Sequence, residues 1–167
     1  VPWKRIFRDV YIQVLDKTYI YDYQVKTQET ENGFNLLGEV DIKGSTSGYG
    51  IEAVLLDSDG KEVAKGEYKA AEKVRYSFEN LQVNKWSAEI PNVYTLYLTL
   101  TQDGEEKEVI RSIVGFRTIK IDGEVFLFND AKIKMKGVNH HDTTPHGGYV
   151  MTPEELLRML NLWKSLT

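Results

Sequence analysis

Apolar and polar residues alternate along most of the first 119 residues of this chain. The pattern is clearest at 34–43, 74–79 and 94–101, where apolar side chains recur at every second position. Successive side chains of a strand point to opposite faces, so a period of two predicts strands with one face in the core and the other in solvent. We expect further strands at 6–14, 19–29, 50–57, 61–68 and 107–119.

Turn-forming pairs separate these predicted strands. Asn32-Gly33, Asp59-Gly60, Asp103-Gly104 and Asp122-Gly123 each place a glycine where a tight turn needs a positive φ. About seven short antiparallel strands in roughly 100 residues are typical of an immunoglobulin-like β-sandwich. The sequence contains no cysteine, so packing alone must hold the predicted core. Disulfides and cysteine-based zinc sites are excluded for the same reason.

The pattern changes after residue 121. Segments 125–128 and 132–136 flank Asn129-Asp130-Ala131 and predict a short hairpin, with the lysines of 132–136 on its solvent face. Segment 137–140 predicts one more strand. A loop rich in turn-forming residues follows it and leads to a predicted helix.

The start of this helix carries a recognisable capping pattern. Thr152 suits the N-cap, Pro153 the first helical position, and Glu155 the position whose carboxylate completes a capping box. We therefore interpret Glu154 and Glu155 as cap and helix-dipole residues rather than as a catalytic pair. The apolar stripe of the helix comprises Leu156, Leu157, Leu160 and Trp163.

A strand, a loop and an amphipathic helix together form one β/α step. A complete (β/α)₈ barrel needs about 250 residues, far more than the chain holds after residue 120. The expected fold class is therefore mainly β. It comprises an immunoglobulin-like β-sandwich, a β-hairpin and the first β/α step of a truncated TIM barrel.

Composition excludes several classes of partner. The chain has 21 basic and 25 acidic residues, a net charge of −4, so we expect no nucleic-acid binding. No apolar run approaches the roughly 20 residues that span a bilayer, so we expect no membrane insertion. The first residues lack the apolar centre of a signal peptide, and the absence of cysteine favours a cytoplasmic protein over a secreted one.

Short stretches along the chain resemble glycoside hydrolase family 2, and most closely its β-galactosidases. The resemblance covers nearly the whole chain, in the order found in the family. It is carried by IFRDVY at 6–11, WSAEIPNVY at 86–94, GFRTI at 115–119, FLFN at 126–129 and KGVNHHD at 136–142.

This resemblance implies the domain organisation and the activity. Residues 1–119 would form the immunoglobulin-like domain, and 120–167 the beginning of the catalytic TIM barrel. Both catalytic glutamates would lie in the rest of the barrel, outside this chain. The chain alone is then expected to be structural and inactive, with no catalytic residue, no metal ligand and no cofactor of its own. A β-galactosidase parent would use magnesium, bind a carbohydrate, contact its own remaining domains and associate as a homo-oligomer.

The resemblance also selects candidate sugar-binding residues. His141 matches the family's histidine that contacts the sugar, whereas His140 stands where the family has Arg or Lys. Asp142 replaces the family's glutamate. In the intact protein, a histidine at the end of the first barrel strand can donate a hydrogen bond to a sugar hydroxyl. Asn139 and Asp142 are expected to hold the loop through backbone hydrogen bonds.

Other interpretations of individual residues remain open at this point. His140, His141, Asp142 and His146 include metal-ligating types, but adjacent strand residues point to opposite faces and would not share one ion. Aromatic residues invite a sugar-stacking interpretation, yet their positions in the pattern favour core or corner packing. These aromatic residues are Trp3, Tyr49, Trp86 and Tyr94.

Two other functions compete with the β-galactosidase hypothesis. One is a β-glucuronidase or β-mannosidase of the same family, because barrel loops and the preceding domain set the specificity. The other is a non-catalytic β-sandwich that binds carbohydrate or protein. Such a module would present an exposed aromatic platform and would not need residues 125–167.

Overall fold

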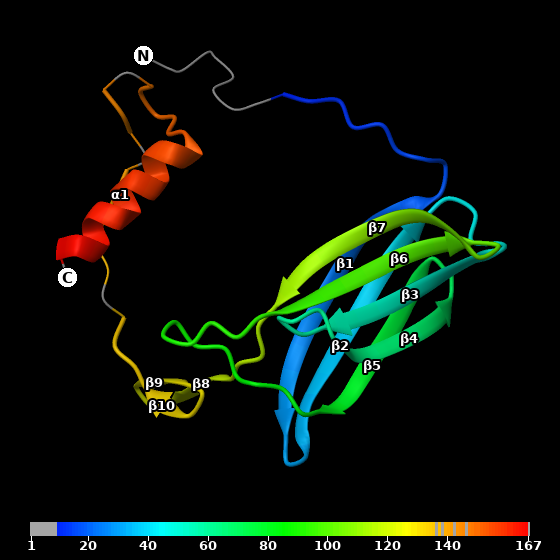
Figure 1. Ribbon diagram of the computed structural model, residues 1–167, viewed down its shortest axis with the longest axis horizontal. Helices are drawn as coiled ribbons and strands as arrows, with labels where there is room; N and C mark the ends of the chain where they lie inside the picture. Colours follow the sequence, from blue (N-terminus) through cyan, green and yellow to red (C-terminus); the bar gives the residue numbers. More distant parts are fainter. Residues whose placement is uncertain (1–9, 136, 138, 142, 146, 167) are drawn as a thin grey trace. The chain divides into compact units, whose positions relative to one another are not determined.

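The computed structural model describes residues 10–135, 137, 139–141, 143–145 and 147–166 (Figure 1). Two compact units are present, Leu15–Lys134 and a smaller unit drawn from 1–14 and 135–167. Each unit is described by itself.

The larger unit contains ten strands. They are β1 (Tyr19–Thr30), β2 (Gly33–Lys43), β3 (Tyr49–Leu56), β4 (Glu62–Lys69), β5 (Lys73–Leu81), β6 (Tyr94–Gln102), β7 (Glu105–Val114), β8 (Ile119–Asp122), β9 (Val125–Phe128) and β10 (Ala131–Lys132). The smaller unit contains one helix, α1 (Pro153–Leu166).

Strands β1 to β7 form a two-layered sandwich. One sheet has the order β1-β2-β5 and the other the order β4-β3-β6-β7, with every neighbouring pair antiparallel. Figure 1 shows the two layers. The core lies between them and is built from the alternating residues of both inner faces. Its fully buried members include Leu36, Val40, Ile51, Leu55, Leu96, Leu98, Leu100 and Phe116. The predicted mainly β, immunoglobulin-like sandwich is confirmed.

The predicted turns are confirmed in their backbone geometry. Asp103 and Gly104 join β6 to β7 with φ values of 51° and 85°, the two positive values that a tight hairpin turn requires. The glycines of the other three predicted turns also have positive φ: 123° at Gly33, 80° at Gly60 and 56° at Gly123.

Tyr94 occupies the corner at which β6 begins. Its side chain is 7% exposed, and its hydroxyl accepts a hydrogen bond from the backbone N–H of Asn84 at 2.9 Å. The ring packs edge-on against Phe116, with 5.2 Å between ring centroids. This is the tyrosine corner of immunoglobulin-like folds. The prediction that Tyr94 is a core or corner residue is confirmed.

The strand predicted at 6–14 is wrong over its described part. Residues 10–16 form no strand, and residues 6–9 lie outside the described residues. Val10, Tyr11, Ile12 and Val14 are 76%, 81%, 94% and 91% exposed. A strand needs a neighbour to receive its backbone hydrogen bonds, and β-prone residues alone do not supply one. No described strand pairs with 10–14.

The predicted strand 107–119 is divided in two. β7 ends at Val114 and β8 begins at Ile119. Between them the chain leaves the sheet because the Phe116 carbonyl accepts the Trp86 N–H at 2.7 Å instead of pairing with β6. Strand β8 then joins β9 and β10 in a small antiparallel sheet.

The predicted hairpin is present but shorter than expected. Asn129 and Asp130 form its turn, with φ of 50° and 63°, and β10 ends at Lys132 rather than at 136. One further backbone hydrogen bond, from Ile133 N–H to the Phe126 carbonyl, extends the pairing. Segment 137–140 is not a strand at its described residues 137, 139 and 140. A barrel strand is stabilised by strands on both sides, and no described residue pairs with this segment.

Helix α1 begins where the capping pattern predicts. Thr152 Oγ1 accepts the Glu155 N–H at 3.3 Å, and Glu155 Oε2 accepts the Thr152 N–H at 2.9 Å. This reciprocal pair is a capping box and confirms the structural interpretation of Glu155. Among the described residues, no helix is long and apolar enough to cross a membrane.

Candidate functional site

The predicted sugar-binding residues fall in the loop that precedes α1. Asn139 and His141 are exposed, and Asp142 lies outside the described residues. The carbonyl of His141 accepts the Thr143 N–H at 2.8 Å. The exposed side chain of His141 is accessible to a ligand.

A tight turn closes this loop. Thr144 and Gly148 exchange two backbone hydrogen bonds of 2.8 and 3.0 Å, and the Gly147 N–H donates to Thr144 Oγ1 at 2.8 Å. Gly148 has φ of 67°, a value that L-residues with side chains rarely adopt. These bonds join Thr144, Gly147 and Gly148 before α1 begins.

His140 packs against the helix. Its ring meets the Trp163 ring edge-on, at 90° and 5.3 Å between centroids. Trp163 belongs to the predicted apolar stripe and is half-buried, whereas Leu156 and Leu160 of the same stripe are 40% and 42% exposed. The contact fixes the residue next to His141 to the last turns of α1. The sequence indicated His140 as a replacement for a basic residue and as a metal-ligating type, and did not predict this contact.

The carboxylates near the helix start serve the helix. The Glu154 carboxylate accepts a hydrogen bond from the backbone N–H of Glu154 and a second one from the Thr152 side chain. These bonds lower the pKa of Glu154 below its usual value. Carboxylates at a helix N-terminus are favoured by the unpaired N–H groups there. Glu154 and Glu155 therefore act as predicted for cap residues.

The candidate metal-ligating residues of the sequence are only partly described by the structure. Within the described ranges, no three His, Asp or Glu side chains come together as metal ligands would. Asp142 and His146 lie outside those ranges. Magnesium, which the sequence resemblance implies for a longer protein, would need a set of oxygen ligands that the described residues do not supply.

A second cluster of interest joins the sandwich to the small β8–β9–β10 sheet. Trp86 lies at its centre, with Phe128 edge-on to its ring at 5.8 Å and the Arg117 guanidinium 5.5 Å from its ring centroid. Gly115 lets the chain pass close to the indole, because a Cβ there would lie 3.0 Å from Trp86 Cγ. With its ring covered in this way, Trp86 is a packing residue rather than a sugar platform, as predicted.

Asn129 stabilises the junction between the sandwich and the β8–β9–β10 sheet through hydrogen bonds to Trp86 and Thr118. Its Nδ2 donates to the Trp86 carbonyl at 3.0 Å, and its Oδ1 accepts the Thr118 N–H at 3.0 Å. Its own N–H donates to the Thr118 carbonyl at 3.0 Å. Asn129 thus ties three segments together. The sequence predicted Asn129 in a turn. Asparagine tolerates a positive φ and its side chain often bonds to nearby backbone, and this was the signal in the sequence for its hydrogen bonds to Trp86 and Thr118.

Ion pairs surround the junction. Lys85 contacts Glu29 at 2.6 Å, and Lys120 contacts Asp130 at 2.7 Å. The hydrogen bond from Lys120 lowers the pKa of the Asp130 carboxyl and raises the pKa of the Lys120 amine. The lowered pKa keeps Asp130 ionised, which suits a structural role rather than a catalytic acid.

Two shallow hollows border the same region. The larger, about 680 Å³, lies between β1 and β7 and is lined by Tyr23, Val25, Ser112, Ile113 and Arg117 among others, with no carboxylate. The smaller, about 530 Å³, includes Glu29, Glu31 and Asp130, of which Glu29 and Asp130 are held in the ion pairs above. Retaining glycoside hydrolysis needs two carboxylates about 5–5.5 Å apart, one of them able to carry a proton. The larger hollow, which has no carboxylate in its lining, offers no such pair.

The fold and these clusters define a structural β-sandwich with a short connecting sheet and a polar loop before a capped helix. The model of the glycosyl hydrolases family 2 matches residues 18–117. The chain therefore belongs to this family, as the sequence motifs indicated.

Relatives support the same assignment. The β-galactosidase of Streptococcus thermophilus is 32% identical over 170 residues, which cover 95% of this chain and 16% of that protein. The β-galactosidase of Staphylococcus xylosus is 33% identical over 159 residues, covering 95% of this chain and 15% of that protein. The chain thus spans only a small part of the length of the curated relatives it matches.

Solved structures confirm the fold. A crystal structure of Ruminococcus gnavus β-glucuronidase in complex with uronic isofagomine matches 90% of this chain and 24% of that chain, with a TM-score of 0.75 and 22% identity. The apo structure of the same enzyme also has a TM-score of 0.75 and 22% identity. At this identity the likeness concerns the architecture alone.

Proposed function

We propose that this chain is part of a retaining β-galactosidase that hydrolyses terminal β-galactosides. The observation that carries the proposal is the similarity to β-galactosidases, 32% and 33% identity over 95% of the chain. The matched region includes the loop with His141, which the family resemblance associates with sugar contact. Residues 1–119 would belong to the sandwich domain and 120–167 to the start of the barrel.

The chain itself would serve as a scaffold without hydrolase activity. Glu29 and Asp130 beside the smaller hollow are held in ion pairs, and Glu155 caps the helix. The junction formed by Trp86, Arg117 and Asn129 would hold the β8–β9–β10 sheet on the sandwich. The sugar-contacting loop would follow that sheet in the sequence.

In the longer protein, His141 would donate a hydrogen bond to a hydroxyl of the sugar. Such a bond lowers the barrier if it strengthens as positive charge develops on the sugar ring. Asn139 and Asp142 would shape the loop that carries it. Magnesium would bind with ligands from outside this chain, and we assign it no step here.

The substrate class is tested with the full-length protein on nitrophenyl β-galactoside, β-glucuronide and β-mannoside. The proposal predicts the highest kcat/KM on the galactoside. A preference for the glucuronide or the mannoside would replace the β-galactosidase with another activity of the same family. No turnover of any glycoside would favour a non-catalytic carbohydrate- or protein-binding module.

A further inference from the structure

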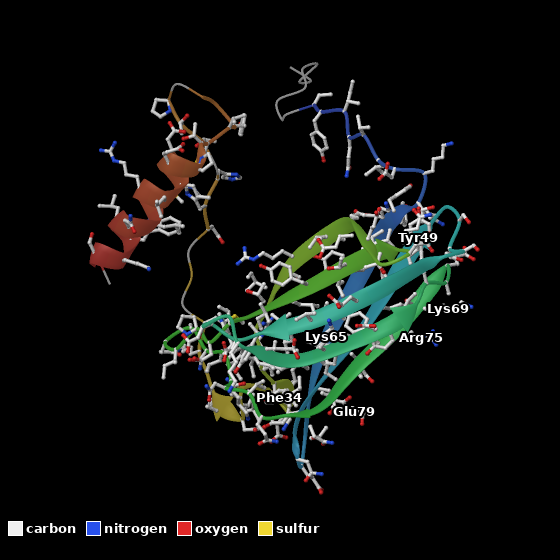
Figure 2. The ribbon with its side chains drawn as sticks, turned by 45° about the vertical axis from the view of Figure 1, so that its right-hand side comes forward. Phe34, Tyr49, Lys65, Lys69, Arg75 and Glu79 are labelled. Atoms are coloured by element: carbon white, nitrogen blue, oxygen red, sulfur yellow. The ribbon has the colours of Figure 1, made fainter. Side chains whose placement is uncertain are left out.

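The turn between β1 and β2 contains the only Asn-Gly pair of the sequence, Asn32-Gly33. It joins strands of 12 and 11 residues at the lower end of the sandwich in Figure 1. Phe34, the residue after Gly33, and Glu79 of the neighbouring strand β5 are labelled in Figure 2. Asn32 is exposed, and its side-chain amide makes no hydrogen bond with any described residue.

Position 33 of this turn has to be glycine. Gly33 has φ of 123°, in the region that residues with a side chain rarely adopt. A Cβ there would lie 2.6 Å from the Leu81 carbonyl oxygen and 2.9 Å from Gln82 Nε2. The turn therefore keeps next to Asn32 the one residue type whose backbone nitrogen is not shielded by a side chain of its own.

Gln82 contacts the peptide group between Asn32 and Gly33. Its Nε2 donates a hydrogen bond to the Asn32 carbonyl oxygen at 2.8 Å and a second one to the Asn80 carbonyl at 3.1 Å. The Asn32 carbonyl is conjugated with the Gly33 nitrogen, so negative charge on that nitrogen spreads to this oxygen. A donor at the oxygen stabilises the deprotonated amide, because hydrogen bonding to a charged form favours that form. The contact with Gln82 thus makes the Gly33 nitrogen a better nucleophile.

We propose that Asn32 is a site of spontaneous deamidation in the folded protein, and that Gln82 promotes the reaction. The Gly33 nitrogen attacks the side-chain carbonyl carbon of Asn32, and the new C–N bond closes a succinimide ring. The bond from this carbon to the side-chain nitrogen breaks, and ammonia leaves with the proton of the Gly33 amide. Water then opens the ring at either carbonyl, which leaves aspartate or isoaspartate at position 32.

The other asparagines of the chain lack this combination of features. Each precedes a residue with a side chain, and Asn92 and Asn129 also use their amide groups to bond to backbone carbonyls. The Asp-Gly turns would react through an ionised carboxylate, which is a poorer electrophile than an amide. At Asp59-Gly60, the Gly60 N–H also donates to the Asp57 carbonyl at 3.1 Å. These positions serve as internal references within one protein.

Conversion of Asn32 would change the turn in two ways. Aspartate at this position adds a carboxylate next to Glu31 and close in sequence to Glu29. Isoaspartate adds one backbone atom to a turn that Thr30 closes, since the Thr30 hydroxyl donates to the Gly33 carbonyl at 3.1 Å and accepts the Asn32 N–H at 3.3 Å. Both products therefore weaken the β1–β2 turn.

Peptide mapping by mass spectrometry tests the proposal on this chain. The folded protein is incubated at mildly alkaline pH, and conversion of each asparagine is followed over time through the mass difference between an amide and a carboxyl group. We expect Asn32 to convert several-fold faster than any other asparagine. Conversion of Asn32 at or below the rate of the others overturns the proposal.

Variants of Gln82 test its part in the reaction. Gln82→Ala removes the hydrogen-bond donor without adding charge, and Gln82→Glu removes the donor while keeping the size of the side chain. Gln28→Glu makes the same charge change on β1, close to the turn in the sequence, and is the matched control. We expect conversion of Asn32 to slow several-fold in both Gln82 variants and to stay near the wild-type rate in Gln28→Glu. Far-UV circular dichroism verifies that each variant is folded before incubation.

Two results would overturn the role of Gln82. Conversion at or above the wild-type rate in both Gln82 variants would mean that the hydrogen bond restrains the turn rather than activates it. Equal slowing in Gln28→Glu and Gln82→Glu would assign the effect to charge near the turn. The reaction involves no sugar and no further domain, so its outcome is independent of the proposed function.

Discussion

The side-chain amide of Asn129 donates a hydrogen bond to the carbonyl oxygen of Trp86, 3.0 Å away, across 43 positions of the sequence. The same side chain accepts the Thr118 N–H. One residue of a two-residue turn therefore connects the sandwich, the crossing segment and the small sheet. The account of this chain as a scaffold depends on that connection.

Replacing Asn129 should loosen the junction. Asn129→Ala removes both side-chain hydrogen bonds and places alanine at a φ of 50°, so we expect a loss of about 1–3 kcal/mol in the free energy of unfolding. Asn129→Gly also loses the hydrogen bonds but relieves the backbone strain, and should be less destabilised than the alanine variant. Urea unfolding of both variants measures the difference. Wild-type stability in Asn129→Ala would contradict the role assigned to the junction.

Gly38 is one of the glycines at which an added side chain would clash with its neighbours. It lies directly opposite Tyr76 in the β2–β5 pairing, and a Cβ at position 38 would overlap the tyrosine ring. Gly38→Ala should therefore cost about 1–3 kcal/mol through forced repacking. Thermal or urea unfolding measures the cost, and Gly60→Ala is a useful comparison, because it has the φ penalty but nothing within 4 Å of its Cβ. The prediction fails if Gly38→Ala is the more stable of the two variants.

The hydroxyl of Tyr76 should govern part of the stability at high pH. Tyr76 is 3% exposed, its hydroxyl has no hydrogen-bond partner among the described residues, and burial raises its pKa above the ordinary value of 10.0. As the pH rises, the Tyr76 hydroxyl loses its proton in the unfolded chain before it does so in the folded chain. The stability that neutral Tyr76 contributes is therefore complete below about pH 10, and it is lost as the pH rises through the pKa of the folded state.

Tyr76→Phe isolates this effect. The variant should match or exceed wild-type stability near neutral pH, because it removes a buried polar atom without a partner. Its advantage over wild type should then grow from about pH 9 to about pH 11. Urea unfolding at each pH measures the difference between the two proteins. A difference that stays constant across this range would show that Tyr76 ionises equally in both states.

His141 should contribute to catalysis in the full-length protein. If it donates to a sugar hydroxyl in the transition state, His141→Ala should lower kcat on nitrophenyl β-galactoside by about 100-fold, with a smaller change in KM. His141→Gln keeps an N–H donor and should retain more activity. His140→Ala is the neighbouring control, since the described contact of His140 is with Trp163. Equal losses in His140→Ala and His141→Ala would indicate general damage to the loop.

The sequence predicted the sandwich well because period-two patterning and Asp-Gly or Asn-Gly turns are local signals. Leu36, Val40, Leu96 and Leu98 alternate in the sequence and all become buried. The capping box of Thr152 and Glu155 was equally predictable, since its two hydrogen bonds span only three residues. The family motifs are short local stretches as well, and they indicated the family that the family model matches over residues 18–117.

What the sequence did not predict depends on partners far away in the chain. Residues 10–14 have strand-like side chains but no described strand to pair with, so the strand predicted there from the sequence pattern was wrong. The break between β7 and β8 arises because Trp86 bonds to Phe116, thirty positions later in the sequence. The contact of His140 with Trp163 likewise needs the loop to fold back on the helix. The sugar-binding roles of Asn139, His141 and Asp142, and the domain boundary at 119, stay predictions.

The most direct test of the central claim is to assay this chain alone, beside the full-length protein, for release of nitrophenol from nitrophenyl β-galactoside. The account predicts turnover by the full-length protein and none by the chain, because the family resemblance places both catalytic glutamates outside this chain. Turnover by the purified chain would contradict the account, because a catalytic pair would then have to lie within these 167 residues.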